Sequence, residues 1–295
     1  MAAEGLPEAG FRHYGPADYD AVCDFLLALC EADRHRVNWN WARFEWMMEH
    51  PQFDKSAAGA MGLWLAVDKV VGAALYDMYF GEAFCGVLPA YSALYPAVLD
   101  YAWEALRDEH GLGVAVCDGD RRQIEAVLAK GFVPAEQRET VMAIPLEGPF
   151  RSRLPAGLRF AVPDPVRDAE RLQWLFWRGF DHGEDRAEFL REDPVVPRVR
   201  PHFDPTLGTA AEDEAGELAS ICGLWHMPGT DYAYVEPVCT VPAWRGRGAA
   251  RAVIFEALER ARARGAKRAY VISDMAFYER LGFRREYGYT FYWKK

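Results

Sequence analysis

The segment Glu236-Pro-Val-Cys-Thr-Val-Pro-Ala-Trp-Arg-Gly-Arg-Gly-Ala-Ala250 decides the fold of this chain. The pattern predicts a strand over residues 232–241, then a glycine-containing loop, and then a long helix over 249–264. Such a loop turns successive backbone N–H groups toward one point at the positive end of a helix, a geometry that binds phosphate. Two glycines permit close approach of a ligand to the backbone and three arginines add positive charge: Gly246, Gly248, Arg245, Arg247 and Arg251.

Two better-known phosphate-binding motifs do not fit this loop. It contains no Gly-Lys-Ser/Thr, which excludes a P-loop. It is not Gly-x-Gly-x-x-Gly, and no acidic residue ends a second parallel strand about twenty residues on, as a dinucleotide-binding fold requires. A glycine pair alone could also be a plain turn between strand and helix, so the loop is interpreted together with the motifs around it.

The ordered set of motifs resembles the GNAT superfamily of N-acetyltransferases. The family's pyrophosphate loop, Gln/Arg-x-x-Gly-x-Gly/Ala, corresponds to Arg245-Gly-Arg-Gly-Ala-Ala250. Its preceding Val-x-Pro-x-x-Arg pattern corresponds to Thr240-Val-Pro-Ala-Trp-Arg245. The Tyr-Glu-Lys-Leu-Gly-Phe ending of the family corresponds to Tyr278-Glu-Arg-Leu-Gly-Phe283. The resemblance spans residues 219–287 in the family's order and spacing.

The resemblance implies acetyl-CoA as co-substrate, with its pantetheine arm between two splayed central strands. The implied pantetheine partners are backbone groups of Val238, Cys239 and Thr240. The implied pyrophosphate-binding loop consists of Arg245, Gly246, Arg247, Gly248, Ala249 and Ala250. Tyr278 takes the position of the family's general acid, which protonates the leaving CoA thiolate; the alternative is a tyrosine that only packs on a short helix.

The general base is expected on the strand before the loop. Period-two alternation places Tyr234, Glu236 and Val238 on one face of that strand. Some family members carry the base two or four residues before the position of Val238, which makes Glu236 the predicted general base, acting directly or through a water molecule. Pro237 and aromatic neighbours could raise its pKa. Alternatively, Glu236 is structural and binds strand N–H groups.

The chain contains an internal duplication. Leu88-Pro-Ala-Tyr91 matches Val241-Pro-Ala-Trp244 at an offset of 153 residues, and Lys130-Gly-Phe132 matches Leu281-Gly-Phe283 at an offset of 151. We therefore predict an α/β fold, with mixed sheets, of two tandem GNAT-like domains at 1–150 and 151–295. In the first half, strands are expected at 62–68, 70–80 and 113–117, and helices at 18–31, 41–49, 97–108 and 123–130. In the second half, strands are expected at 207–211, 218–227, 232–241 and 268–272, and helices at 166–180, 249–264 and 276–281.

The first half lacks the family's residues at the positions that bind the cofactor and donate the proton. The duplication aligns Ser92 with the loop arginine Arg245 and aligns Tyr95 with Gly248. Pro96 follows Tyr95 and has no N–H to offer a phosphate. Val127 stands at the position of the catalytic tyrosine. The first half is therefore predicted to be a degenerate copy that binds no CoA.

Composition limits the classes of partner. The chain of 295 residues has a formal net charge of −10, and its first 150 residues carry 23 acidic against 11 basic side chains, which argues against nucleic-acid binding. Seven scattered histidines form no H-x-x-x-H or H-E-x-x-H spacing, so no metal site is predicted. Six cysteines without a C-x-x-C pair, no apolar run of about 18 residues and no basic leader predict a cytoplasmic protein without membrane contact, as a monomer or homodimer.

The predicted reaction is transfer of an acyl group, most simply acetyl, from acyl-CoA to a primary amine by direct attack. The acidic segment 181–193 could attract a cationic small-molecule acceptor, or be a solvated loop. Four aromatic residues of the first half could line an acceptor cleft or pack a helix: Trp39, Trp41, Phe44 and Trp46. Other two-repeat enzymes of this kind are mycothiol synthase and the tRNA-dependent peptidoglycan aminoacyl transferases, the latter disfavoured by the acidic first half. A non-catalytic CoA- or small-molecule-binding module is the remaining alternative.

Overall fold

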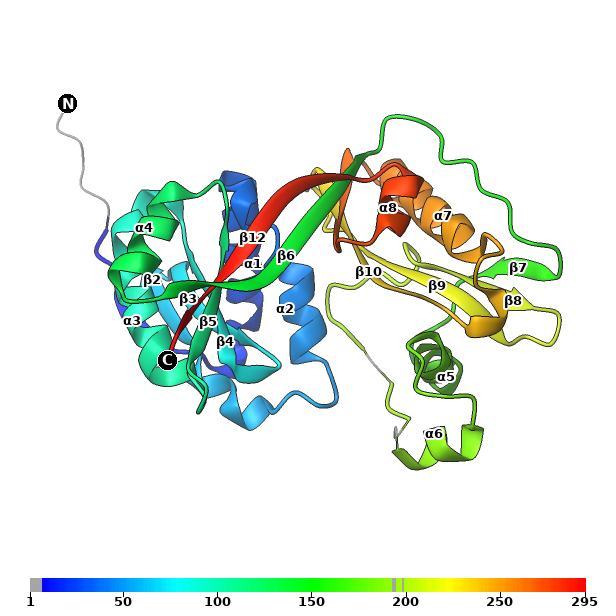
Figure 1. Cartoon of the computed structure of the whole chain (residues 1–295), viewed down its shortest axis with the longest axis horizontal. Coiled ribbons are helices and arrows are strands. Elements are labelled where there is room, and N and C mark those ends of the chain that lie inside the picture. The colour runs from blue at the N-terminus through cyan, green and yellow to red at the C-terminus, as the bar shows by residue number, and fades with distance from the viewer. Residues whose placement is uncertain (1–6, 193–194, 198) are drawn as a thin grey trace. The chain divides into compact units, whose positions relative to one another are not determined.

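The computed structural model describes residues 7–192, 195–197 and 199–295. The chain forms two compact units (Figure 1). The first comprises Met1–Val141, Ile272–Asp274 and Arg285–Lys295, and the second comprises Met142–Val271 and Met275–Arg284. Over the described residues, none of the helices combines the length and the apolar character needed to cross a membrane.

The first unit is a mixed sheet with helices packed on it. Its strands run in the order β1-β2-β3-β4-β5-β12-β6, in which β4 and β5 are parallel neighbours. Helices α1 and α2 pack against each other, and α3 packs on β3 and β4. The strands are β1 (Gly10–His13), β2 (Gly62–Ala66), β3 (Lys69–Asp77), β4 (Tyr79–Val87), β5 (Leu112–Cys117), β12 (Arg284–Lys294) and β6 (Val133–Pro145). The α-helices are α1 (Tyr19–Ala32), α2 (Trp41–Met48), α3 (Tyr95–Leu106) and α4 (Arg121–Ala129), and 3₁₀ turns occupy Pro16–Asp18, Arg34–Arg36, Lys55–Ala60 and Pro89–Leu94.

Two tight hairpins explain where the predicted strands of the first unit differ from the observed ones. The β2–β3 turn is at Val67 and Asp68, both with positive φ, as a two-residue turn of this type requires. The β3–β4 turn is at Met78, with φ of 59°. The prediction ran one strand through this second turn and missed β4, because methionine carries none of the usual turn signals.

The second unit has the order β11-β10-β9-β8-β7, with β10 and β11 parallel and the other pairs antiparallel. Helix α7 covers one face and α5 the other. Cys222 and Leu224 of β9 pack in the core with α7, whereas Ile221, which precedes Cys222 and points to the opposite face, packs with α5. The strands are β7 (Leu158–Ala161), β8 (Thr209–Asp213), β9 (Leu218–Trp225), β10 (Tyr232–Thr240) and β11 (Arg268–Ile272). The helices are α5 (Ala169–Gly179), α6 (Arg186–Glu192), α7 (Ala249–Ala263) and α8 (Ala276–Leu281), with a 3₁₀ turn at Pro242–Trp244.

The compact units differ from the predicted division at 1–150 and 151–295 in how two strands are shared. Strand β6 contributes its residues up to Val141 to the first unit, whereas Met142 and Ile144 belong to the core that contains α7. The C-terminal strand β12 pairs antiparallel with β5 of the first unit, from Tyr289 opposite Cys117 to Lys294 opposite Leu112. The first unit therefore completes its sheet with the last residues of the chain.

Candidate active site

Strand β10 separates from its parallel neighbour halfway along its length. Its pairing with β11 covers Tyr232 to Tyr234, opposite Arg268 to Tyr270, although β10 continues to Thr240. On the other side, β10 stays paired with β9 as far as Thr240. The second half of β10 therefore has an edge turned away from β9 that does not pair with β11, as the predicted pantetheine site requires.

A β-bulge interrupts β10 at the predicted general base. Val235 pairs with Leu224, and the next pair is Val238 with Cys222, so Glu236 and Pro237 together face Gly223. No side chain fits at Gly223, because a Cβ there would lie 2.7 Å from Pro237 Cδ. The signal for this bulge in the sequence was the proline next to Glu236, which the prediction interpreted as an influence on its pKa.

The bulge corrects the predicted alternation along β10. Ala233, Val235 and Val238 all pack with the core that contains α7, so Val238 does not share a face with Tyr234. Cys239 packs in the core of α5 on the opposite face. The extra residue shifts the period-two pattern by one position, because a bulge places two consecutive residues opposite one residue of the partner strand.

The three predicted pantetheine partners differ in what their groups contact. The N–H of Val241 bonds to β9, so the backbone of Cys239 also faces β9, and its carbonyl accepts a hydrogen bond of 3.1 Å from Ser220. By the alternation of an antiparallel ladder, the backbone groups of Val238 and Thr240 face away from β9, and the Thr240 carbonyl accepts a hydrogen bond of 2.9 Å from Arg245. The Cys239 thiol is buried against α5, and burial raises its pKa to about 12, so it is not a ready nucleophile.

The loop between β10 and α7 has the geometry of an anion site. Gly246 and Gly248 have φ of 71° and 91°, values that L-residues rarely adopt, and open space surrounds both. Gly248 is the N-cap of α7 and provides no side-chain acceptor, so the first N–H groups of the helix, at Ala249 and Ala250, point outward without an intrahelical partner. An anion placed there would accept these hydrogen bonds and meet the positive end of the helix.

The loop arginines are arranged in two ways. Arg247 lies over the ring of Trp244 at 5.3 Å, next to the helix start. Arg245 instead turns toward the end of α5: its guanidinium donates to the carbonyl oxygens of Thr240 and Gly179, both at 2.9 Å, and pairs with Asp181 at 2.9 Å. The Arg245 side chain therefore links the loop to the end of α5.

Tyr278 is on α8, which ends at Gly282 in the left-handed conformation. The tyrosine is 8% exposed, and its ring packs edge-on against Phe277 and Phe283. Burial raises the pKa of its hydroxyl, and the charges of Cys222 and Glu236 raise it further. The phenol therefore keeps its proton at neutral pH, and the charge of Glu236 acts on it.

The corresponding segment of the first unit has no anion site of this kind. A 3₁₀ turn over Pro89–Leu94 runs directly into α3, and none of its residues has positive φ. Tyr95 is 4% exposed, and within the described part of the chain its hydroxyl has no hydrogen-bond partner. Val127 is fully buried on α4, where a catalytic tyrosine would stand. Buried Arg36 lies nearby and donates to Asp120 at 2.7 Å.

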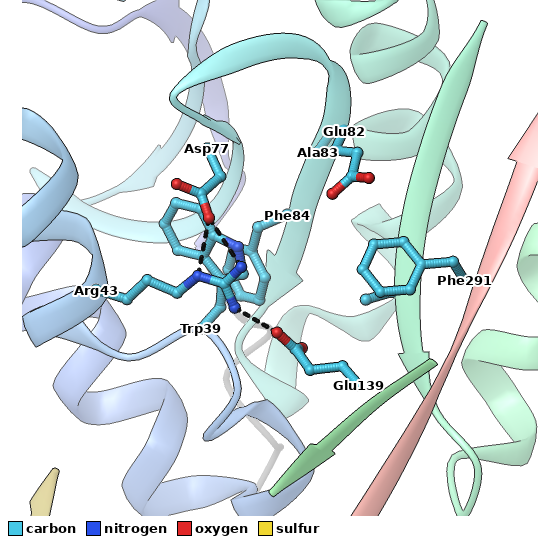
Figure 2. Close-up of a pocket in the computed structure, with 9 residues that line it drawn as sticks. Trp39, Arg43, Asp77, Glu82, Ala83, Phe84, Glu139 and Phe291 are labelled. Carbon is cyan, nitrogen blue, oxygen red and sulfur yellow. Dashed lines mark hydrogen bonds and ion pairs between the residues drawn. The ribbon is translucent and has the colours of Figure 1, made fainter. Parts of the chain in front are cut away.

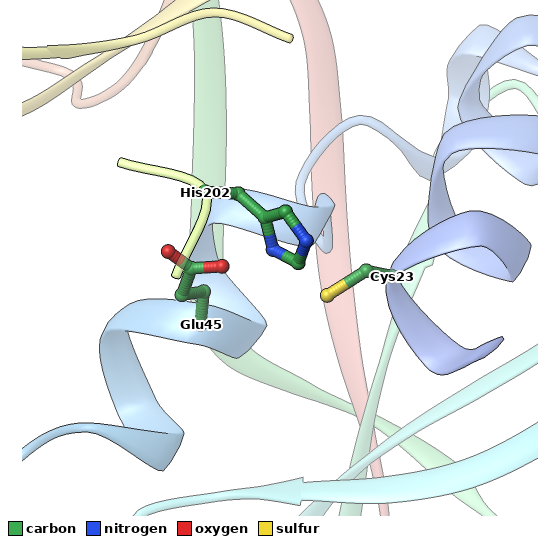
Figure 3. Close-up of side chains that lie close together, drawn as sticks. All are labelled: Cys23, Glu45 and His202. Carbon is green, nitrogen blue, oxygen red and sulfur yellow. The ribbon is translucent and has the colours of Figure 1, made fainter. Parts of the chain in front are cut away.

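Two groups of titratable residues in the first unit lie in the packing of its helices and in their caps. Cys23 of α1 and Glu45 of α2 lie close together (Figure 3), and burial, followed by the charge of Glu45, raises the pKa of the Cys23 thiol. Asp33 accepts a hydrogen bond from the backbone N–H of His35 at 3.0 Å, and Asp120 caps α4. Neither group includes a residue of the predicted site.

Comparison with known proteins finds a family match in the second half of the chain. Residues 167–283 match the model of the Acetyltransferase (GNAT) family. A mycothiol acetyltransferase of Thermobispora bispora is 30% identical over 196 residues, which cover 61% of this chain and 65% of that protein, slightly less than two thirds of its length.

Solved structures extend the likeness to the whole chain. A GCN5-related N-acetyltransferase from Sphaerobacter thermophilus has a TM-score of 0.59 at 19% identity, covering 98% of this chain and 96% of that one. A tandem GNAT protein from the clavulanic acid biosynthesis pathway has a TM-score of 0.61 at 17% identity, covering 97% and 98%. At this identity the likeness shows the fold, and it confirms the prediction of an α/β chain with two GNAT-like domains. Residues 167–283 thus form a domain of the GNAT family, and the whole chain has the fold of a tandem GNAT protein.

Proposed function

We propose that this GNAT protein transfers an acetyl group from acetyl-CoA to a primary amine of a small molecule, and that the second unit performs the reaction. The observation that carries the proposal is the conjunction of an anion-binding loop at the start of α7 with a separated edge of β10. Phosphates at the loop and an extended arm along the strand fit CoA, because one group is anionic and the other needs backbone hydrogen bonds.

In the proposed reaction, Glu236 accepts a proton from the acceptor ammonium and leaves a neutral amine. The amine nitrogen attacks the acetyl carbonyl carbon, and the carbon–sulfur bond then breaks. The nitrogen of the tetrahedral intermediate gives up its second proton to solvent as this bond breaks. Tyr278 donates its proton to the departing thiolate and recovers one from solvent, and Glu236 releases its proton to solvent. The buried position of Tyr278 is compatible with this role, because its raised pKa keeps the phenol protonated at neutral pH, which is the form a proton donor must have.

A mycothiol-type acceptor is the second, more specific candidate, favoured by the relative of that name. The test is a panel of primary amines, including a mycothiol-type amine and cationic amines, incubated with acetyl-CoA and followed by thiol release and product mass. Acetylated product from any amine supports the proposal, and a preference for the mycothiol-type amine supports the narrower one. Saturable CoA binding without product from any amine would instead indicate a non-catalytic CoA-binding module.

A further inference from the structure

The carbonyl oxygen of Glu236 lies in the bulge of β10, and a side chain of β9 binds it. The indole N–H of Trp225 donates a hydrogen bond of 2.8 Å to this oxygen. Pro237 has no N–H, so the carbonyl is the only hydrogen-bonding group of the peptide unit that joins Glu236 to Pro237. The two residues of a bulge depart from the regular ladder, so their orientation depends on contacts of this kind.

The surroundings of Trp225 hold its indole in one orientation. The residue is 1% exposed and pairs directly with Tyr234, two residues before Glu236. Phe203 packs against the indole with ring centroids 4.5 Å apart, and the guanidinium of Arg200 lies over the indole at 5.5 Å. A change of rotamer would break these contacts together, because it moves the whole ring. The indole N–H is therefore directed at the bulge.

The hydrogen bond orients the backbone of Glu236 and, with it, the side chain. Val235 pairs with Leu224 on the N-terminal side of the bulge, and the indole binds the carbonyl on the C-terminal side. The direction of the Cα–Cβ bond follows, because the bonds at Cα have nearly fixed angles. Displacement of a catalytic group by about 1 Å can lower a rate by about 10²-fold, so this restraint bears directly on a proton acceptor.

The first unit has neither the bulge nor the carboxylate at the corresponding place. The offset of 153 residues aligns Ala83 of β4 with Glu236. There β4 pairs with β3 without interruption from Val87 to Ala83. Ala83 lies in the wall of a small pocket in which Arg43 pairs with two carboxylates (Figure 2). The bulge and its indole bond thus occur in the unit that has the anion-binding loop.

We propose that Trp225 is the positioning residue of the general base: it binds the bulge carbonyl of Glu236 and so directs the Glu236 carboxylate at the acceptor nitrogen. Its effect on the rate passes through Glu236, which is the group that meets the acceptor. The inference rests on the proposed function, in which Glu236 takes the proton of the ammonium. It adds to that function a residue that belongs to none of the cofactor-binding motifs.

A double-mutant cycle tests this role in the full chain, with acetyl-CoA and an amine that the wild type acetylates. Trp225→Phe keeps an aromatic ring and removes the N–H, so kcat should fall by about tenfold while CoA affinity stays unchanged. In the Glu236→Gln background the same substitution should change kcat by less than about twofold, because no base is left to position. Trp293→Phe is the matched control: it removes an indole hydrogen bond of 3.1 Å to Gln137 in the first unit and should leave kcat unchanged.

A second variant and a second measurement support the cycle. Phe203→Leu keeps the indole N–H and removes the ring packed against it, so kcat should fall by about threefold, again only where Glu236 is present. Hydrogen exchange followed by mass spectrometry needs no turnover, and it should show faster exchange over residues 235–240 in both variants. Unchanged exchange of this segment in Trp225→Phe would show that the indole bond does not hold the bulge.

The outcomes separate this inference from the proposed function. Equal losses of kcat for Trp225→Phe in the wild-type and Glu236→Gln backgrounds would show a purely structural role and refute the inference alone. A wild-type kcat in Glu236→Gln would refute Glu236 as the base, and the role of Trp225 with it. Absence of transfer by the wild type to every amine of the panel would refute the proposed function itself, and the positioning role as well.

Discussion

Tyr278 differs from an ordinary tyrosine in its burial, which raises its pKa and holds the proton on the phenol. Because the folded-state pKa lies above the ordinary value near 10, the phenol stays protonated at neutral and at mildly alkaline pH. We expect Tyr278→Phe to lower kcat by about tenfold or more and to leave CoA affinity nearly unchanged. Steady-state kinetics and calorimetry measure the two effects. A normal kcat would remove Tyr278 from the mechanism.

Glu236 is expected to act at the opposite end of the reaction, on the acceptor. Glu236→Gln should lower kcat by about tenfold or more and abolish the acidic limb of the pH–rate profile, because that limb reports protonation of the base. Glu214→Gln, in the exposed turn between β8 and β9, is the matched control and should behave as the wild type. If Glu236→Gln is slow but keeps its acidic limb, the base is another group and Glu236 only supports the bulge.

Gly248 provides a test of the cofactor loop that separates binding from backbone strain. Gly248 and Gly265, near the two ends of α7, both have positive φ and open space around the missing side chain. Alanine at either position should lower the free energy of unfolding by about 1–2 kcal/mol. Only Gly248→Ala should also weaken CoA binding, by about tenfold, because a side chain at this position shifts the backbone N–H groups that bind the phosphates. Equal CoA affinity in the two variants would show that the loop does not hold the phosphates.

At the scale of secondary-structure elements, Arg245 connects the cofactor loop to the end of α5. Its two bonds to backbone carbonyls are independent of the ion pair with Asp181, whose side chain is 65% exposed. We expect Asp181→Asn to change stability by less than about 0.5 kcal/mol, because exposed ion pairs contribute little. Arg245→Gln should lower the free energy of unfolding by about 1–2 kcal/mol, because the carbonyls of Thr240 and Gly179 both lose a charged hydrogen-bond donor.

Urea unfolding measures these two stabilities, and CoA titration adds the functional contrast. If Arg245 mainly supports α5, Arg245→Gln should weaken CoA binding less than Arg247→Gln does, although both variants remove one positive charge from the loop. A larger loss of CoA affinity in Arg245→Gln would indicate that Arg245 binds phosphate, as the motif implies.

Local patterns predicted the strand–loop–helix around 236–250 because its glycines and prolines carry their own conformational restrictions. Gly246 and Gly248 indeed have positive φ, and α8 has the predicted bounds. The bulge at Glu236 could not be predicted in the same way, because it depends on the close approach of Gly223 from another strand. For the same reason two partners of Arg245 were not foreseen: Gly179 and Asp181 lie at and just after the end of α5, more than sixty residues away in sequence.

At the scale of the whole molecule, the duplication is visible in short matching strings but the sharing of strands is not. The matching strings Lys130-Gly-Phe132 and Leu281-Gly-Phe283 mark equivalent segments of the two repeats. The first string is followed by strand β6, and the second by strand β12. Which unit receives each of these strands depends on pairing between distant residues, and two repeats of similar pattern offer similar edges. A division at the midpoint of the chain therefore followed from the sequence, and the assignment of β12 to the first unit did not.

This assignment gives a prediction that depends on chain topology. Tyr289 of β12 is 1% exposed and pairs with Cys117, whereas Tyr270 of β11 is fully buried and pairs with Tyr234. Tyr289→Ala and Tyr270→Ala should each destabilise the protein by about 3 kcal/mol or more, because both leave an unfilled aromatic site. Hydrogen exchange followed by mass spectrometry should separate them: Tyr289→Ala should speed exchange in β5 of the first unit, and Tyr270→Ala in β10 of the second. If Tyr289→Ala acted instead on β10 and its helix, the C-terminal strand would belong with the second unit, as the sequence alone predicts.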